Sequence, residues 1–331
     1  QSPIPNPHKE LNNIAILTAT EINKIDDTYI INAEIVNPQA PDKQANISAP
    51  FIIYTGTGKT IGEAYRNIKL SSSRYLYPEH LQILIINESI AKEDISQILD
   101  FYLRNPSIRT EFNVLIGKDN DILSTTTPID EISSSSIYET LKTNNHYQGV
   151  ANLTTLNELA GLAVFKDNKL LGYLDNNQSI SYNIIKNHIN STIISYECEK
   201  DKYLSAEIID SKSNISTKNN QINIDINIKT TINETNCNLK LNDNQNIKSL
   251  ENDLSIYLNN DLEKDINYIR NTYNADVFGF LDEIYKHNYK EYQKIKDNWY
   301  NDIYRNYKIK LNTKVNIISK GNIMEGYNEK D

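Results

Sequence analysis

The chain is poor in the residues that build reactive or membrane-spanning elements. Its 331 residues include two cysteines, five histidines, one tryptophan and one methionine. No stretch approaches the roughly 20 consecutive apolar residues that a membrane-spanning helix needs. A tetrahedral zinc site needs four ligands at short spacings, which Cys198 and Cys237 do not supply. The sequence therefore predicts neither a spanning helix nor a zinc-binding module.

The two cysteines leave two interpretations open. Cys198 and Cys237 each lie in a segment with a strand-like pattern, and nothing in the pattern says whether the two segments lie together. We favour two buried thiols, because free cysteine behaves as a small apolar residue. A single disulfide is the alternative if the chain is exported to an oxidising compartment.

The excess of acidic over basic residues argues against nucleic acid as a partner. Lys and Arg number 34 against 43 Asp and Glu, which gives a net charge of −9. Proteins that bind nucleic acid concentrate basic residues on one face. We therefore expect no nucleic-acid partner.

Motifs of the common enzyme classes are absent from the sequence. It contains no His-Glu-x-x-His run, no Gly-x-Ser-x-Gly elbow and no reactive-cysteine signature. The histidines are scattered singly along the chain. We expect no catalytic residue, no metal ligand and no cofactor, and the prediction is a protein that is not an enzyme.

Hydrophobic periodicity in the first half alternates between strand and helix. A hairpin is expected around a turn at Lys24 to Asp27, and a second around Asp167 and Asn168. Between them, strands and helices alternate over about residues 50–125, which favours a βαβ lobe. This reading gives strands over 51–54, 81–86 and 112–116, helices over 60–70 and 90–103, and a further helix-like stretch over 153–159.

The second half reads as a sheet followed by two long helices. Alternating apolar residues predict strands over 191–198, 203–209, 221–229 and 308–318, and apolar stripes predict helices over 250–273 and 282–304. The fold class is therefore α+β and multi-lobed, with mixed sheets, a βαβ-type N-terminal lobe and a C-terminal lobe of sheet plus two long helices. We expect a flexible tether over 1–9, an N-terminal region over 10–180 and a C-terminal domain over 181–331.

The run Gly56-Thr57-Gly58-Lys59-Thr60 ends like a phosphate-binding loop. Such a loop also needs a glycine five positions before Gly58, where this chain has Ile53. We favour a turn in which Thr60 and Glu63 cap the following helix. Three positions remain candidates for contact with a ligand or partner: Gly58, His80 before an apolar strand, and Arg104 at a helix end.

An ordered series of short segments resembles the Ger(x)C family, the lipoprotein C subunits of spore germinant receptors. The series spans nearly the whole chain, and its members are Glu10–Ile16, Gly58–Ala64, His80–Ala91, Leu99–Pro106, Ala163–Leu174, Ala275–Phe280 and Lys296–Trp299. Leu281 and Tyr292 depart from the family pattern, which has a further glycine and a tryptophan at those positions.

The resemblance implies a function by contact. It implies a non-enzymatic lipoprotein held on the outer face of the spore inner membrane by a lipid on a cysteine just ahead of Gln1. It also implies assembly with the A and B integral membrane subunits into a nutrient receptor that triggers germination, in which this subunit is a scaffold or couples the signal. Direct nutrient binding is the alternative, and a spore hydrolase or an NTP-binding protein is less favoured.

Overall fold

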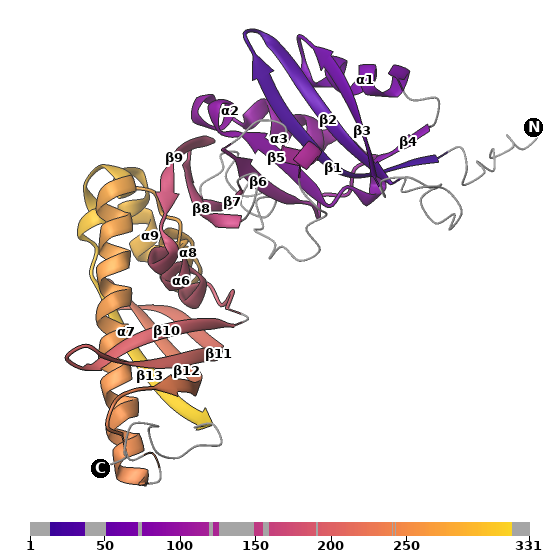
Figure 1. The fold of residues 1–331 in the computed structure, drawn as a ribbon. Coiled ribbons are helices and arrows are strands. Elements are labelled where there is room, and N and C mark those ends of the chain that lie inside the picture. The colour runs from indigo at the N-terminus through magenta and orange to yellow at the C-terminus, as the bar shows by residue number, and fades with distance from the viewer. Residues whose placement is uncertain are drawn as a thin grey trace, which may run out of the picture. The chain divides into compact units, whose positions relative to one another are not determined.

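The computed structural model divides the chain into two compact units, with the boundary between Tyr173 and Leu174 (Figure 1). It describes residues 14–36, 51–71, 75–118, 122–125, 149–154, 159–189, 191–239, 241 and 243–319. The tether expected over residues 1–9 lies outside this set. None of the helices in these ranges is both long enough and apolar enough to cross a membrane.

Unit 1 (Gln1–Tyr173) is built on a mixed nine-stranded sheet. Its strands are β1 (Ile14–Ile25), β2 (Thr28–Val36), β3 (Phe51–Gly58), β4 (Tyr75–Tyr77), β5 (Ile83–Asn87), β6 (Asn113–Gly117), β7 (Gly149–Thr154), β8 (Leu159–Lys166) and β9 (Lys169–Leu174). The order is β3-β2-β1-β5-β6-β7-β8-β9, and β4 pairs with β1 off this path. The central strands β1, β5, β6 and β7 run parallel, and antiparallel strands flank them.

Three helices share the main core of unit 1 with this sheet. They are α1 (Ile61–Ser71), α2 (Glu88–Glu93) and α3 (Ser96–Arg104). Ile68 of α1 and Tyr102 of α3 are fully buried with Ile86 of β5. Tyr102 donates its hydroxyl to Thr20 Oγ1 at 2.9 Å, so its one polar atom is satisfied inside the core. A smaller cluster holds Ile85 with α4 (Ile122–Thr125), because successive strand residues point to opposite faces.

Most elements predicted for this half are confirmed. β5, α2, α3 and β6 form a βαβ unit with parallel strands, as the alternation over 50–125 predicts. The hairpin around Asp167 and Asn168 is β8 and β9, and both turn residues have positive φ, 51° and 66°. The division at 173/174 precedes the boundary expected at 180/181, which falls inside a helix.

Two helix predictions in unit 1 are wrong in extent or type. The stripe over 90–103 is two helices, because Asp94 is extended (φ −174°) and its carboxylate accepts the Ser96 N–H at 2.6 Å. A short acidic side chain that bonds to a nearby N–H competes with the helix. The helix-like stretch over 153–159 lies in strands β7 and β8 at its two ends, where pairing of β7 with β6 and of β8 with β7 decides the conformation.

Unit 2 (Leu174–Asp331) packs the long helix α7 (Asn244–Tyr273) along a four-stranded sheet of order β10-β11-β12-β13 (Figure 1). The strands are β10 (Thr192–Glu199), β11 (Lys202–Lys218), β12 (Gln221–Thr235) and β13 (Ile309–Ser319). Ile224 and Ile226 of β12 are buried, whereas Asp225 and Asn227 between them are exposed. The alternating strand predicted over 221–229 is confirmed, and its polar residues lie on the solvent-exposed face. The strand predicted over 308–318 is β13. It pairs in parallel with β12, and the sequence pattern does not predict this neighbour.

Side chains of α7 also satisfy backbone groups at the β13 edge of this sheet. Val315 N–H donates to Ser255 Oγ at 2.9 Å, and Ile317 N–H donates to Glu251 Oε1 at 2.8 Å. Unpaired N–H groups on an edge strand invite pairing with another chain. The helix therefore closes the edge as well as the apolar face.

The helix predicted over 282–304 is a series of shorter segments. These are α8 (Phe280–His287), α9 (Tyr289–Ile295) and then short 3-10 and π-helical turns to Asn306. Asn288 breaks the run at φ −146°, and its side chain caps α9 by accepting the Glu291 N–H at 3.2 Å. The apolar stripe that predicts one helix over 282–304 would turn Tyr285 and Tyr289 inward, but they are 52% and 57% exposed.

The predicted fold class is confirmed by this α+β arrangement of mixed sheets and long helical spans. Helix α6 (Asn176–Ile185), like the short α4, lies outside the predicted elements. Its capping box was present in the sequence: Asp175 accepts the Gln178 N–H at 2.8 Å, and Gln178 accepts the Asp175 N–H at 3.1 Å.

The favoured interpretation of two buried thiols is wrong. Cys198 near the end of β10 and Cys237 beyond β12 form a disulfide, with Cα atoms 6.3 Å apart. The chain after β12 is also held beside β11 by the Asn236 N–H, which donates to Tyr203 O at 3.1 Å. The two cysteines come close because segments distant in the sequence pair as strands. The residues that flank each cysteine do not reveal this pairing.

Reduction of this disulfide is expected to destabilise unit 2. The bond closes a loop with a sequence separation of 39 residues, and the loop-entropy model assigns such a loop about 4 kcal/mol. We expect dithiothreitol to lower the melting temperature of the protein. The Cys198→Ser/Cys237→Ser variant should melt at the reduced temperature with or without dithiothreitol, and equal melting of the wild type in both states would contradict this.

Candidate functional site

The sequence analysis predicts that the chain has no metal site, and for the full chain this stays a prediction. Within the ranges that the structure describes, no three His, Cys, Asp or Glu side chains are grouped to hold a metal ion. His80, His188 and His287 belong to this part of the chain, and they lie on separate elements.

The glycine-rich turn between β3 and α1 is a packed helix cap. Glu63 N–H donates to Thr60 Oγ1 at 3.1 Å, and Lys59 N–H donates to the Glu63 carboxylate at 2.7 Å. A Cβ on Gly58 would lie 2.6 Å from Ala64 N, so glycine allows the strand to approach the helix this closely. These bonds agree with the capping interpretation. A ligand or partner contact at Gly58 stays a prediction.

His80 is the last residue of a 3-10 turn, Pro78–His80, two residues before β5. It is exposed, and its ring centroid lies 5.6 Å from that of Tyr77. The position is therefore accessible to a partner. Its assignment as a contact residue also stays a prediction.

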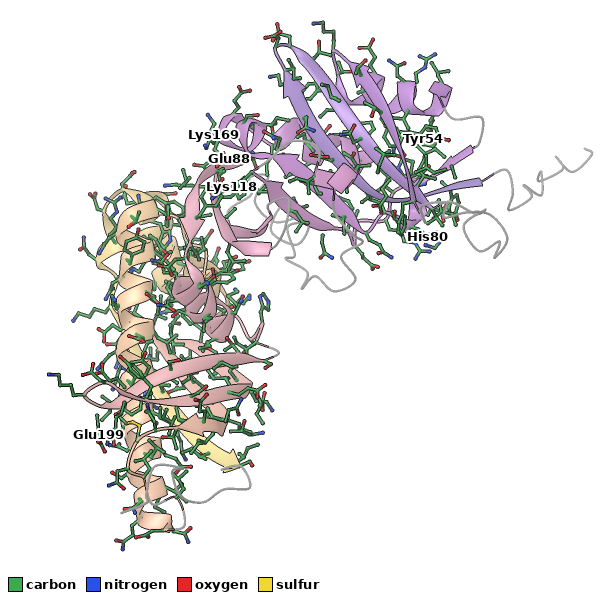
Figure 2. The ribbon with its side chains drawn as sticks, in the orientation of Figure 1. Tyr54, His80, Glu88, Lys118, Lys169 and Glu199 are labelled. Atoms are coloured by element: carbon green, nitrogen blue, oxygen red, sulfur yellow. A yellow bond between two sulfur atoms is a disulfide. The ribbon has the colours of Figure 1, made fainter. Side chains whose placement is uncertain are left out.

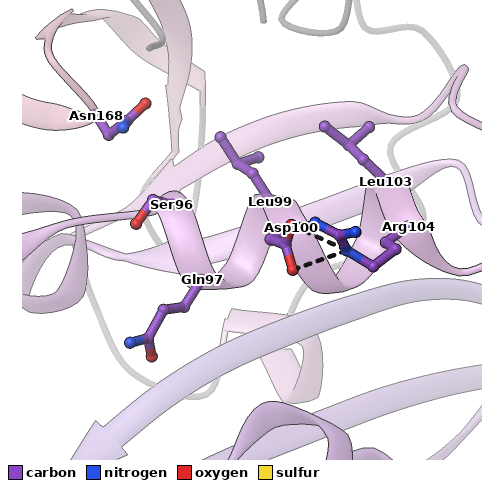
Figure 3. A pocket seen from close by; sticks show the side chains of 7 residues that line it. All are labelled: Ser96, Gln97, Leu99, Asp100, Leu103, Arg104 and Asn168. Atoms are coloured by element: carbon purple, nitrogen blue, oxygen red, sulfur yellow. Dashed lines mark hydrogen bonds and ion pairs between the residues drawn. The ribbon is translucent and has the colours of Figure 1, made fainter. Parts of the chain in front are cut away.

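Arg104 lines a depression of about 690 Å³ along α3 (Figure 3), a size in the range of small-molecule sites, about 300–1,000 Å³. Its guanidinium is paired with Asp100 at 2.5 Å, and this hydrogen-bonded contact lowers the pKa of the Asp100 carboxyl. Neither His80 nor Gly58 belongs to the lining. The lining residues are Ser96, Gln97, Leu99, Asp100, Leu103, Arg104 and Asn168.

A polar cluster that the sequence reading missed holds the end of β9 in unit 1. Tyr173 donates its hydroxyl to the Glu88 carboxylate at the start of α2, and Lys118 Nζ lies 4.6 Å from the Tyr173 ring centroid. Burial alone would raise the pKa of Glu88, but hydrogen bonds from Tyr173 and Lys92 hold it below its usual range. Glu88 and Lys118 are both labelled in Figure 2. The cluster fixes the last strand of unit 1.

The most enclosed carboxylate in unit 2 is Asp276. Its Oδ1 accepts the Phe280 N–H at 2.9 Å, and its Oδ2 accepts the Leu281 N–H at 2.8 Å and Trp299 Nε1–H at 3.3 Å. Burial raises the pKa of Asp276 to about 6, although these three donors favour the charged form. Asp276 therefore caps α8 and ties it to the segment that contains Trp299.

Arg270 extends this network to the end of the helical region. Its guanidinium, which is buried, donates to the carbonyl oxygens of Tyr304 and Tyr307, the latter at 2.8 Å. Tyr304 donates its own hydroxyl to Ala275 O at 2.9 Å. The backbone of the last helical turns is thus held to α7 and to the segment before α8, which is a structural role.

Unit 1 has a buried carboxylate in a similar role. Glu21 of β1 is 1% exposed and accepts the N–H groups of Ile122 and Leu123 at 3.0 and 3.3 Å. Asn32 of β2 donates to the same carboxylate at 3.4 Å. Glu21 and Asp276 are therefore both occupied by donors from the protein itself.

These features define a two-unit α+β protein in which the enclosed polar groups support the fold. Two family models match the chain: the spore germination protein N-terminal domain over residues 7–171, and the spore germination B3/GerAC-like C-terminal domain over residues 160–321. The chain belongs to the Ger(x)C family of spore germination proteins, as its segments predict.

Comparison with individual proteins agrees with this assignment. The chain is 26% identical to spore germination protein KC of Bacillus subtilis (strain 168), over 88% of this chain and 86% of that protein. It is 20% identical to spore germination protein B3 of the same organism, over 95% and 93%. The crystal structure of the GerBC protein shares the fold, with a TM-score of 0.62 and 19% identity over 90% of this chain and 96% of that chain.

Removal of the Asp276 carboxylate is expected to destabilise unit 2. Asp276→Ala leaves three buried N–H donors without an acceptor, and each costs about 1–3 kcal/mol. We expect the free energy of unfolding to fall by at least about 3 kcal/mol in urea titrations. The exposed carboxylate Asp297 serves as the control, since Asp297→Ala should change the same quantity by less than about 0.5 kcal/mol.

The stabilisation that Asp276 provides should also depend on pH. Because its folded pKa of about 6 lies above the unfolded value of 3.8, its contribution is complete below the lower pH and declines as pH rises through the higher one. The difference in unfolding free energy between wild type and Asp276→Ala should therefore be larger at about pH 4 than at about pH 7. A difference that grows with pH would contradict the raised pKa.

Proposed function

We propose that this chain is a non-enzymatic C subunit of a nutrient germinant receptor, which acts as a scaffold or couples the germination signal. In this proposal it is a lipoprotein on the outer face of the spore inner membrane, and it assembles with the A and B integral membrane subunits. Family membership supports the assignment, and so do the relatives whose names describe spore germination proteins. The occupied state of the buried carboxylates favours a role by contact over a catalytic one.

The observation that carries the coupling role is the direct connection between the two units. β9 ends at Leu174, and α6 begins at Asn176, so only Asp175 separates the last strand residue from the helix. The chain therefore passes from β9 to α6 without a linker of several residues.

Both sides of this connection are anchored within their own unit. On one side, the Tyr173 hydroxyl bonds to Glu88. On the other, the Asp175 side chain caps α6. Rigid elements with fixed ends transmit a displacement better than a polar loop of several residues does.

The coupling role is tested by the insertion of Gly-Ser-Gly between Leu174 and Asp175. We expect each unit to keep its melting transition, because Glu88 and the α6 capping box remain in place. Spores that carry this variant should assemble the receptor but respond to nutrients at least about tenfold more slowly, since the inserted glycines form a flexible spacer. The readouts are release of dipicolinic acid from the spores and co-purification of the A and B subunits.

The same insertion after Asp201, at the tip of the β10–β11 turn, is the matched control. It should leave the germination rate unchanged. A normal rate with the insertion at Leu174 would refute the coupling role, and a failure of the wild-type chain to co-purify with receptor subunits would refute the assignment as a subunit.

Direct nutrient binding is the second candidate, and the depression along α3 favours it. Its volume suits a small molecule, and the exposed Asp100–Arg104 pair offers both charges at its wall. If this function holds, calorimetry of the isolated chain with candidate nutrients should give heat of binding that Arg104→Gln abolishes and Lys92→Gln, in another i,i+4 ion pair, preserves. Absence of binding would leave the coupling role as the sole candidate.

A further inference from the structure

The solvent-exposed face of strands β11, β12 and β13 is rich in lysine. We name it the lysine face, and it consists of the outward residues of 210–218, 221–229 and 310–316. Its outward lysines are Lys212, Lys218, Lys229, Lys310 and Lys314, and all five are exposed. The acidic residues on the same face are Asp210 and Asp225. The face is therefore positive in a chain whose net charge is −9.

Strand register places these side chains in rows across the sheet. One row is Lys212, Asn227 and Lys314, whose backbones pair directly. Four positions back along β13, the row of Ser216, Asn223 and Lys310 also faces outward. Adjacent strands lie about 4.8 Å apart, so the lysines form a flat array rather than a pocket.

Little of this positive charge is neutralised within the face. Lys229 is paired with Asp210 at 3.0 Å. Asp225 accepts a hydrogen bond from the Asn312 amide at 3.0 Å. No ion pair of Lys212, Lys310 or Lys314 is found among the described residues.

The composition of the face indicates what kind of surface it fits. Protein–protein interfaces are enriched in aromatic residues and depleted in lysine. The lysine face holds lysine, asparagine and serine, and it holds no aromatic residue. A positive array whose outward residues within these bounds are all polar suits an anionic surface, which it would touch without insertion.

We propose that the lysine face of β11–β13 docks on the headgroups of an anionic phospholipid bilayer. At physiological ionic strength the screening length is about 8 Å, so the bilayer responds to the face that it touches rather than to the net charge of the whole chain. Basic side chains close to an anionic bilayer each strengthen binding measurably. The inference goes beyond the proposed receptor role and does not depend on it.

The proposal is tested by flotation of the purified full chain with lipid vesicles. One set contains phosphatidylcholine with roughly 30% phosphatidylglycerol, and the other contains phosphatidylcholine alone. We expect binding to the anionic set at about 0.05 M salt, weaker binding at about 0.3 M salt, and none to the neutral set. The variant Lys212→Gln/Lys310→Gln/Lys314→Gln should bind at least about tenfold more weakly.

A second triple variant controls for charge alone. Lys248→Gln/Lys264→Gln/Lys290→Gln changes three exposed lysines on α7 and α9 of the same unit, and it should bind as the wild type does. An equal loss in both triple variants would overturn the proposal, and so would binding to neutral vesicles. Retention of the chain on polyglutamate beads without vesicle binding would also overturn it, in favour of an acidic protein segment.

Discussion

Unit 2 depends on the contact between one helix and one face of a sheet. Ile222, Ile224, Ile226 and Ile228 are buried on one face of β12, and Leu254, Leu258 and Leu262 are buried on α7, which packs along the same sheet. Full burial of each such side chain contributes about 1.5–3 kcal/mol. The same helix places Glu251 and Ser255 against the free N–H groups of β13. Because α7 satisfies both the apolar face and the polar edge, its position is fixed along and across the sheet.

The enclosed carboxylates follow a common rule. Asp276 and Glu21 each lie where several backbone N–H groups converge, and those donors balance part of the cost of burying a charge. In unit 2 the bond from Trp299 to Asp276 joins the segments Ala275–Phe280 and Lys296–Trp299, by both of which the chain resembles its family. The family pattern in this region therefore marks a packing network, in which a tryptophan, an aspartate and a glycine turn have complementary shapes.

Local chemistry was readable from the sequence, whereas long-range pairing was not. The cap at Thr60, the Asp167-Asn168 turn and the alternation of β12 were predicted, and each depends on residues within a few positions of one another. The cap at Asp175 is equally local, but it was not predicted. By contrast, the disulfide of Cys198 depends on which strands become neighbours. The depression at Arg104 depends on Asn168 lying beside α3, and no periodicity reports such a contact. Asn288 was a local signal that the helical stripe concealed, since a single capping residue outweighs several apolar matches.

The single residue between β9 and α6 has a practical consequence for the design of protein fragments. Ser181 in α6 donates to the buried carboxylate of Asp265 in α7 at 2.6 Å, and Tyr182 and Ile184 lie in the core of the second unit. A fragment that starts at Leu174 retains the whole of α6 with its cap. A fragment that starts beyond Ile184 would leave Asp265 without its hydroxyl partner and open apolar surface to water. The first residue of any recombinant C-terminal half thus decides whether it is a faithful substitute for that half in the intact chain.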